Sequence, residues 1–421
     1  MKFKVVKLSE IATVQTGPFG SQLHKEDYVE VGIPIITVEH LGENKILHQN
    51  LPLVGEEDYN RLRKYHLKID DIVFSRVGSV DRRALVSELE DGWMFSGRCL
   101  RVRVVDKNVN PKYLSYYFGT KSFKEYIRSI AVGATMPSIN TKILSDIELK
   151  IPSLEVQNLI VELLYNIDSK IWNNDSIINK LDEISQLIFK NWFINFEFPN
   201  EQGLPYRSSG GEMVESEFGG IPKEWKNVEL KTLTTLHKKT FNPKKSELEE
   251  VVHFSLPAFD VKNYPMIDKV ENIKSNKWIV EENCVLFSKM NPITPRIWVP
   301  KVHKKYLNVA SSEFVVLRNE NFKETAFIYT LCKSEPFIEY LKSNATGSTN
   351  SRQRITPDNA MLYTLPLDLE VVNDFSVIVS PLIEQIQELY EEINKLELLR
   401  NILLPKLLTG EIEIPDESVV G

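Results

Sequence analysis

The sequence predicts a mixed α/β fold in which two similar domains alternate with two long helices, and these helices are expected to form an antiparallel coiled coil. Two observations support this prediction. Residues recur in the same order at a displacement of 214 positions, and a long heptad pattern of apolar residues follows each copy. This displacement far exceeds the about 20–50 residues of a solenoid repeat, so the repeated unit is a whole domain with its helix.

The repeat is clearest near the end of each domain. A segment at 71–75 resembles 284–288 at a displacement of 213. Two similar domains in one chain indicate two similar ligand sites. Seven residues of the first copy return in order in the second: Phe123, Glu125, Tyr126, Ala131, Gly133, Thr135 and Pro152 match Phe337, Glu339, Tyr340, Ala345, Gly347, Thr349 and Pro366.

Within each copy, short segments rich in β-branched and apolar residues are bounded by turn residues, which predicts strands. These strands are expected at 32–38, 71–74 and 99–105 in the first copy and at 284–287 and 314–318 in the second. The ranges 111–130 and 326–343 predict helices that end at the repeated glycine loop. Gly133 and Gly347 fit C-terminal helix caps about as well as they fit backbone lying close to a phosphate.

Apolar residues separated by alternating steps of four and three extend over 160–192 and 375–407, which is typical of coiled-coil helices. One such stripe would fit a surface helix packed on a globular core equally well, but two stripes of matching length favour mutual pairing. Asn174 lies within the first stripe, where a buried amide can fix the register. Pro381 is tolerated only near a helix start or at a kink, and Pro405 is expected to bend or end the second helix.

These patterns divide the 421 residues into six segments. The hydrophobic content of 42% is sufficient to bury a core in each domain. The predicted order is a first domain at 1–152, a first long helix at 153–196, a linker at 197–226, a second domain at 227–368, a second long helix at 369–410 and a C-terminal tail at 411–421.

The net charge of −7 is unevenly distributed along the chain. Residues 1–150 carry 22 basic and 19 acidic side chains and residues 201–370 carry 23 and 22, so these two regions sum to +4. The segments 151–200 and 371–421 carry 3 against 7 and 3 against 10, which sums to −11. Because the acidity is confined to the helices, the domains are free to present local basic surfaces to an anionic partner.

The composition argues against a membrane-spanning or secreted protein. No apolar run approaches the ~18 residues that span a bilayer, and the first residues lack the apolar core of a signal peptide. Cys99, Cys284 and Cys332 lie far apart and have no metal-binding or redox spacing. We therefore expect reduced, partly buried cysteines in a cytoplasmic protein.

Four motifs, taken in order, resemble those of one protein family. They are Phe74-Ser-Arg-Val-Gly78, Gly133-Ala-Thr-Met-Pro-Ser-Ile139, Gly219-Gly-Ile-Pro-Lys-Glu-Trp225 and Leu403-Leu-Pro-Lys-Leu-Leu-Thr-Gly410. Over essentially its whole length the chain resembles a specificity subunit of a type I restriction-modification system, in which two target-recognition domains alternate with two long helices.

The resemblance implies a subunit that has no chemistry of its own and binds a bipartite, asymmetric site on double-stranded DNA. Each domain would read one half of the site, and the helices would set the gap between the halves. The resemblance also implies two methyltransferase subunits as partners, which bind S-adenosylmethionine. It further implies restriction subunits, which act as motor and nuclease and use ATP and Mg. Such a complex would act in a prokaryotic cytoplasm, away from membranes.

Missing motifs agree with a role in recognition rather than catalysis. The chain has no Asn/Asp-Pro-Pro-Tyr/Phe run of an amino-methyltransferase, no Gly-x4-Gly-Lys-Ser/Thr phosphate loop and no histidines at metal-ligand spacing. We therefore expect neither a catalytic residue nor a bound metal. The alternative that stays open is a coiled-coil interaction scaffold whose two domains bind protein.

Candidate DNA contacts are chosen by residue type and by position on loops, because phosphates are bound mainly by Lys and Arg and bases by Arg, Lys, Asn, Gln, Ser and Thr. In the first domain the candidates are Gln15, Ser21, Gln22, Arg76, Ser79, Arg82, Arg83 and Thr135. In the second domain they are Lys238, Lys239, Lys244, Lys245, Lys289, Asn291, Thr294, Arg296, Thr349, Asn350, Arg352 and Arg354.

Overall fold

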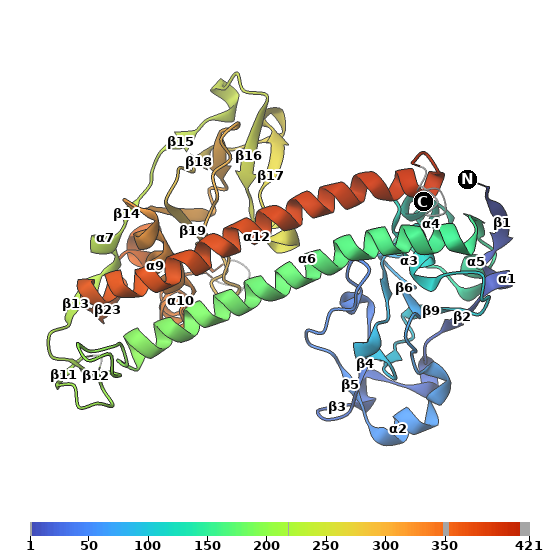
Figure 1. The fold of residues 1–421 in the computed structure, drawn as a ribbon, viewed down its shortest axis with the longest axis horizontal. Coiled ribbons are helices and arrows are strands. Elements are labelled where there is room, and N and C mark those ends of the chain that lie inside the picture. Colours follow the sequence, from blue (N-terminus) through green and yellow to red (C-terminus); the bar gives the residue numbers. More distant parts are fainter. Residues whose placement is uncertain (1, 218, 348–352, 413–421) are drawn as a thin grey trace, which may run out of the picture. The chain divides into compact units, whose positions relative to one another are not determined.

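The computed structural model of the chain describes residues 2–217, 219–347 and 353–412. It has a mixed α/β fold with two long helices, as the sequence predicted (Figure 1). The chain divides into two compact units. Unit 1 comprises Met1–Ser169 with Glu397–Gly421, and unit 2 comprises Lys170–Leu396. Both long helices cross the boundary between these ranges, so each unit contains a part of both helices.

Unit 1 contains a four-stranded antiparallel sheet in the order β2 (Ala12–Thr16), β9 (Cys99–Val104), β6 (Ile72–Ser75) and β7 (Arg83–Leu85). All four residues of β6 are buried, which explains why this strand reads as a continuous apolar run. A second sheet has the order β3 (Tyr28–Val29), β5 (Leu53–Val54), β4 (Ile33–Ile36) and β8 (Met94–Phe95), and β1 (Lys4–Lys7) pairs with β10 (Glu148–Ile151). Short helices connect these strands: α1 (Leu8–Ile11), α2 (Glu56–Arg61) and α5 (Thr141–Ser145).

Unit 2 repeats the four-stranded sheet of unit 1, whereas its second sheet has five strands instead of four. Its four-stranded antiparallel sheet has the order β14 (Thr235–Leu236), β22 (Phe314–Arg318), β19 (Cys284–Ser288) and β20 (Ile297–Trp298). Its second sheet has the order β15 (Thr240–Phe241), β18 (Lys277–Ile279), β21 (Asn308–Ala310), β16 (Glu250–Phe254) and β17 (Met266–Lys269). Two further strand pairs are β13 (Lys226–Glu229) with β23 (Thr364–Leu367), and β11 (Met213–Ser216) with β12 (Gly219–Pro222). The short helices of unit 2 include α7 (Leu230–Leu233), α8 (Leu256–Lys262) and α11 (Pro357–Ala360).

Each helix predicted between the sheet and the glycine loop is divided in two. In unit 1 the pair is α3 (Pro111–Gly119) and α4 (Lys121–Ile130), and in unit 2 it is α9 (Phe322–Lys333) and α10 (Glu335–Ser343). The residue between the helices is extended in both units, with ψ of 149° at Thr120 and 145° at Ser334. The Thr120 hydroxyl accepts a hydrogen bond from the Phe123 amide at 3.2 Å, so it caps a new helix instead of continuing the old one.

The long helices are α6 (Leu154–Phe189), which continues into a π-helical turn at Lys190–Ile194, and α12 (Leu369–Thr409). Within unit 2 they lie side by side in opposite directions. Asn174 of α6 bonds Glu392 of α12 at 2.8 Å, whereas Phe189, further along α6, packs against Phe375, which is earlier in α12. The predicted antiparallel pairing of the helices is therefore confirmed.

Pro405 was expected to bend or end the second helix, and it does not end it, since α12 continues to Thr409. The turn beyond the proline contains Leu407 and Leu408, which are 1% and 7% exposed and belong to the core of unit 1. Burial of two leucines offsets the hydrogen bond that the proline cannot donate. The end of α12 thus completes the first domain. Among the described residues, no helix has the length and apolarity needed to cross a membrane.

Candidate nucleic-acid interface

Three chain segments meet at one edge of the four-stranded sheet of unit 1. Thr16 of β2 pairs with Leu100, and Ser75 of β6 pairs with Cys99. Both strands are antiparallel to β9, so they run parallel to each other and end where β9 begins. The loops that leave β2 and β6 therefore lie beside the residues that lead into β9.

A fourth segment, the glycine loop after α4, is bound to the same edge. Val77 and Ser138 form a β-bridge, and the Gly78 amide donates to the Pro137 carbonyl at 2.8 Å. We call the surface formed by residues 17–25, 76–82, 97–98 and 131–139 the strand-end surface of unit 1.

Unit 2 builds the same surface from the corresponding loops. Met290 and Arg354 form the bridge, and the Asn291 amide donates to the Gln353 carbonyl at 2.9 Å. The strand-end surface of unit 2 consists of the described residues among 237–245, 289–296, 312–313 and 345–355.

Hydrogen bonds around the central strand establish which residues of the two surfaces correspond. The hydroxyl of Ser75 donates to the carbonyl two residues later at 2.9 Å, and the hydroxyl of Ser288 does the same at 2.9 Å. The Ser75 amide donates to the Arg82 carbonyl at 3.0 Å, and the Ser288 amide donates to the Arg296 carbonyl at 2.9 Å. Arg82 and Arg296 therefore occupy equivalent positions.

A second set of bonds places the residues that precede β9 and β22. The Arg76 amide donates to the Arg98 carbonyl at 2.8 Å, and the Lys289 amide donates to the Glu313 carbonyl at 2.9 Å. Arg76 thus corresponds to Lys289, and Arg98 to Glu313. The first pair has the same charge in both units, whereas the second pair has opposite charges.

Arg76 is half-buried at the centre of its surface. Its guanidinium carbon lies 5.6 Å from the centroid of the Phe19 ring, and its Nη1 donates to the Gly97 carbonyl at 3.1 Å. Phe19 itself is 59% exposed. A Cβ on Gly97 would lie 2.6 Å from the Phe19 Cβ, so only glycine lets this loop approach so closely. Arg76 is thereby held in place beside an exposed aromatic ring.

Three other predicted residues of unit 1 reach the surface. Ser79 and Thr135 are exposed, and Arg82 is half-buried. The Arg82 guanidinium makes no hydrogen bond or ion pair with any residue in the described ranges, so it is available to an anionic ligand.

The two glutamines predicted as DNA contacts are already engaged within the domain. Gln15 accepts a hydrogen bond from Arg101, and Gln22 accepts one from the Tyr65 hydroxyl at 2.6 Å. Both side chains are half-buried. The side chain of Ser21 lies outside the described part of the structure.

Arg83 lies in the interior rather than on the surface, with 2% of the residue exposed. Its Nε donates to the Ser115 carbonyl at 2.8 Å and its Nη1 pairs with Glu43 at 3.0 Å. Burial raises the pKa of Glu43, but Arg83 and Lys124 beside it outweigh this effect and lower the pKa. Arg83 therefore connects β7 to α3, which explains its burial without a ligand.

In unit 2, the four predicted lysines after β14 are all exposed. Lys239 pairs with Glu281 at 2.6 Å, and this hydrogen bond lowers the pKa of the carboxyl group. The side chains of Lys238, Lys244 and Lys245 form no hydrogen bond or ion pair within the part of the chain that the structure describes.

The loop after β19 holds its predicted residues with local contacts. Asn291 adopts a left-handed conformation with φ of 52°, and Thr294 donates its amide to the Asn291 carbonyl at 3.0 Å. Arg296 makes a bidentate pair with Asp260, at 2.6 Å and 2.9 Å, so part of its charge is neutralised. Lys289 is half-buried.

Arg354 is exposed and its Nη2 lies 3.3 Å from Glu313 Oε1. The predicted contacts Thr349, Asn350 and Arg352 lie outside the described residues.

Two residues of the surfaces were missed by the sequence reasoning. Arg98, the residue directly before β9, is exposed, and Phe19 is exposed beside Arg76. Arg98 directly precedes the strand expected at 99–105, whereas the candidate Arg76 closely follows the strand expected at 71–74. The pair Gly97-Arg98 before the strand at 99–105 was the signal that could have identified it.

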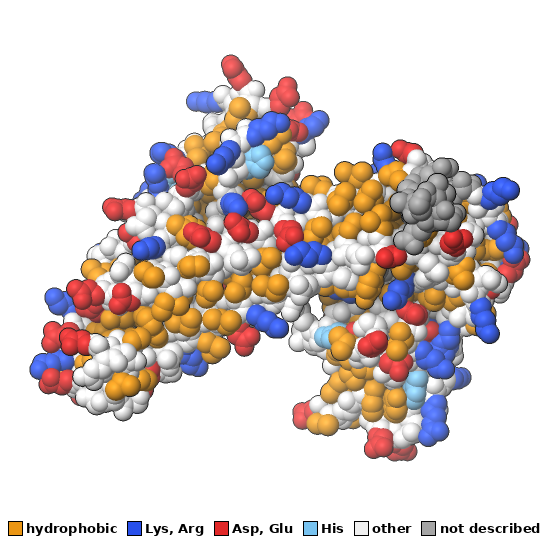
Figure 2. Space-filling model, in the orientation of Figure 1, with side chains coloured by type: hydrophobic (Ala, Val, Ile, Leu, Met, Phe, Trp, Pro, Cys, Tyr) orange, Lys and Arg blue, Asp and Glu red, His pale blue; other side chains and the backbone are white. Residues whose placement is uncertain are grey.

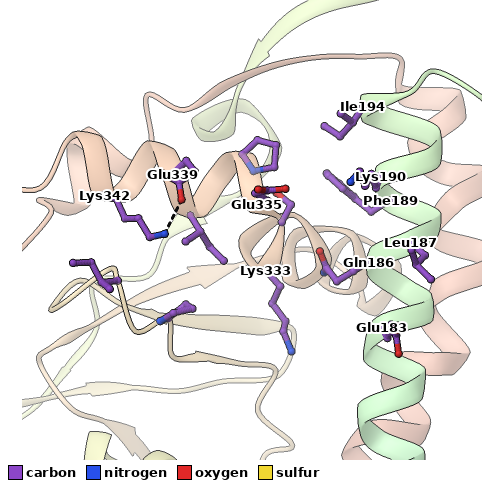
Figure 3. A pocket seen from close by; sticks show the side chains of 15 residues that line it. Glu183, Gln186, Leu187, Phe189, Lys190, Ile194, Lys333, Glu335, Glu339 and Lys342 are labelled. Carbon is purple, nitrogen blue, oxygen red and sulfur yellow. Dashed lines mark hydrogen bonds and ion pairs between the residues drawn. The ribbon is translucent and has the colours of Figure 1, made fainter. Parts of the chain in front are cut away.

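A cleft of about 580 Å³ lies next to the loop after β19 in unit 2. Residues of α6 and α10 line this cleft (Figure 3), and Ile293 and Pro295 of the loop also belong to its lining. Among its charged groups, Lys333 contacts Asp182 and Lys342 lies 2.6 Å from Glu339. Within the described ranges, no group of three His, Cys, Asp or Glu side chains is placed to hold a metal ion.

The known proteins and the family model that this chain resembles are specificity subunits of type I restriction systems or their DNA specificity domain. The model of the type I restriction modification DNA specificity domain matches residues 1–183. The specificity subunit of the type I restriction enzyme MjaIX from Methanocaldococcus jannaschii is 27% identical over 330 residues, which are 74% of this chain and 72% of that protein. The specificity subunit of the type I restriction enzyme HindI from Haemophilus influenzae is 23% identical over 441 residues, covering 88% of this chain and 92% of that protein.

A solved structure shares the fold along nearly the whole chain. The S subunit of a type I restriction-modification system from M. genitalium aligns with a TM-score of 0.56 and 14% identity, covering 99% of this chain and 96% of that one.

Proposed function

Because residues 1–183 belong to the type I restriction-modification DNA specificity domain family, as the sequence resemblance predicted, we propose that the chain is the subunit that recognises DNA sequence in such a complex. Each strand-end surface binds one half of a bipartite, asymmetric duplex. The observation that carries this proposal is the pair of surfaces, which share one backbone arrangement and display different side chains.

The distribution of cations supports binding to DNA rather than to protein. Arg76 and Lys289 are equivalent basic residues, and so are Arg82 and Arg296. A cation kept at the same place in both units suits the phosphate backbone, which is the same in both halves of any target. The differing residues around them suit base edges, which differ between halves.

The buried cysteines support a role without chemistry of the chain's own. Burial raises the pKa of Cys99 to about 12 and also raises the pKa values of Cys284 and Cys332. A buried thiol with a raised pKa is a poor nucleophile, so none of the three cysteines is suited to thiol catalysis. The chemistry would come from partner subunits, with S-adenosylmethionine on methyltransferase subunits and ATP and Mg on restriction subunits.

Exposed apolar side chains on the long helices support docking of two methyltransferase subunits there. In unit 2, Ile184, Leu187 and Ile194 follow one another on α6 and the turn after it, and Val377 and Ile378 lie on α12. Their exposed fractions range from 40% to 58%. Figure 2 shows apolar side chains gathered over this part of the helices. An apolar patch on a helix that also has a packed face is typical of a protein interface.

The test uses the chain assembled with its methyltransferase subunits. A randomised duplex library bound by this complex should yield two short conserved sequences separated by a fixed gap. Inserting one base pair into the gap should lower affinity at least about tenfold, because one half then turns away from its surface. A library that returns no preferred sequence, with the methyltransferase still captured, would instead identify the chain as a protein scaffold.

Replacement of single cations tests the surfaces themselves. Arg82→Ala should weaken binding and reduce the slope of log K against log salt by about 0.9 for one lost phosphate contact. Lys107→Ala is the matched control, because Lys107 is exposed at the opposite end of β9. Equal effects of the two substitutions would contradict the assignment of the strand-end surface.

A further inference from the structure

We infer that two neighbouring positions within the strand-end surface determine which base each half reads. They are 98 and 138 in unit 1 and the equivalent 313 and 354 in unit 2, and we call them the variable pair. In both units one arginine of the pair reads a guanine: Arg98 in unit 1, and Arg354, oriented by Glu313, in unit 2. This inference rests on the proposed DNA-binding function.

The equivalence of the first position follows from strand register. Ser75 pairs with Cys99, and Ser288 pairs with Phe314, so Arg98 and Glu313 each precede the first paired residue of the strand. The equivalence of the second position follows from the loop. Ser138 bridges to Val77 in unit 1. In unit 2, Arg354 makes the same bridge to Met290.

The variable pair is polar in both units but differently charged. In unit 1, Arg98 is exposed and its guanidinium has no hydrogen bond or ion pair with the described residues. Ser138 turns its hydroxyl back to the Val132 carbonyl at 3.1 Å. This position therefore offers one unengaged guanidinium, the group that forms the commonest specific contact with guanine O6 and N7.

In unit 2 the arginine of the variable pair is Arg354, which stands at the position equivalent to Ser138. Arg354 keeps 56% of its side chain exposed, while Glu313 beneath it keeps 26%. Glu313 Oε1 accepts from Arg354 Nη2 at 3.3 Å. The second carboxylate oxygen of Glu313 is buried and has no hydrogen-bond partner among the described residues.

A carboxylate at a DNA-binding surface is repelled by the phosphates, so its presence needs a compensating interaction. The contact with Arg354 supplies one: it holds the guanidinium by Nη2, which also contacts Met290 Sδ at 3.9 Å, while Nε and Nη1 have no hydrogen-bond partner among the described residues. Glu313 is thus a positioning residue, and Arg354 is the group that meets the base. An arginine held by a carboxylate loses less side-chain freedom when it binds, which favours a bidentate contact.

The neighbouring cations do not explain sequence discrimination. The Arg76 guanidinium packs on the Phe19 ring and donates to the Gly97 carbonyl, and Arg296 forms an ion pair with Asp260. Both also have a basic counterpart in the other unit. Two halves of an asymmetric target must be told apart by positions whose chemistry differs. In the variable pair, the arginine stands at the first position in unit 1 and at the second position in unit 2.

The experiment repeats the library selection with variants of the assembled complex. Arg98→Gln should lower the preference for guanine at one position of the first half about tenfold or more and leave the second half unchanged. Arg354→Lys keeps the charge but removes the planar fork, so it should do the same at one position of the second half while the salt dependence stays as in the wild type. The matched controls are Lys107→Gln in unit 1 and Lys323→Gln in unit 2, both exposed beyond the opposite end of the sheet.

The role of Glu313 is tested by replacing it both in the wild-type chain and in the Arg354→Lys variant. Glu313→Gln should weaken the preference at the position read by Arg354, and it should have no further effect when Arg354→Lys is already present. Uniform loss of affinity at every position, with a flatter salt dependence, would overturn base reading in favour of phosphate contact. Unchanged selection profiles for Arg98→Gln and Arg354→Lys would also overturn it. A wild-type complex that selects no sequence would refute the proposed function instead.

Discussion

The helix pair α6 and α12 is held by different polar contacts in the two units. In unit 1, Asp168 is fully buried, bonds Arg400 at 2.6 Å and accepts from the Tyr116 hydroxyl at 2.8 Å. In unit 2, buried Asn174 bonds Glu392, whose side chain is 44% exposed and also lies 3.5 Å from Lys170.

This difference separates two ways of fixing helix register. A buried ion pair is strongly disrupted when one partner is removed, because a charge is then left without compensation. A buried amide next to a hydrated carboxylate costs some stability but excludes other registers. The unit 1 contact thus ties the helices to the domain through Tyr116, whereas the unit 2 contact aligns the helices with each other.

The largest expected effect is in unit 1. Arg400→Leu leaves Asp168 buried without its cation and should lower the free energy of unfolding by about 3–5 kcal/mol. Denaturant unfolding of the full chain measures this loss. The control is the double variant Asp168→Leu with Arg400→Leu, which buries no charge and should recover most of the stability. A single variant within about 1 kcal/mol of wild type would show that water reaches the carboxylate.

The unit 2 contact should respond in the opposite direction. Asn174 Oδ1 is buried without a hydrogen-bond partner in the described residues, so Asn174→Leu removes an unsatisfied acceptor and adds an apolar contact. We expect unchanged or slightly higher stability, by up to about 1 kcal/mol, in the same unfolding experiment. Glu392→Gln, which keeps an acceptor for Asn174, is the control. A clear loss of stability in Asn174→Leu would show that the amide stabilises the helix pair as well as aligning it.

The sequence was a good guide to the parts of the fold that are repeated. The displacement of 214 residues predicted two similar domains, and the heptad stripes predicted the paired helices, because both signals extend over many residues. The helix breaks at Thr120 and Ser334 were missed, since apolar periodicity continues through them. The Thr120 hydroxyl caps the helix that follows it, whereas the helix after Ser334 begins with a proline in its first turn and has no side-chain cap.

The candidate site was less accessible to sequence reasoning. Arg82 and Arg83 are adjacent and chemically identical, yet one reaches the surface and the other is buried against Ser115 and Glu43. Arg82 precedes β7, whereas Arg83 is its first residue and packs against α3, and this packing is not visible in the sequence. The equivalence of Arg98 with Glu313 also required hydrogen bonds between strands, because the two segments have different neighbours in sequence.

A smaller difference between the units is expected in acid. In unit 2, burial lowers the pKa of His253, although Asp268, 2.7 Å away, raises it, and burial likewise lowers the pKa of His237 against the effect of Glu281. A histidine in the unfolded chain has a pKa of about 6.5. Stability from these residues is therefore fully present above this value, and it is lost as the pH falls through the lower pKa of the folded state.

Hydrogen exchange at pH 7.5 and 5.5, corrected for the intrinsic rate, measures this loss strand by strand. Protection of β16 and β17, which hold His253 and Asp268, should fall at the lower pH. His253→Asn retains a donor for Asp268 and does not titrate, so it should reduce the change in protection. An equal change in this variant would assign the acid sensitivity to other groups. Because Asp268 offsets part of the burial effect, we expect this change to be smaller than the loss in Arg400→Leu.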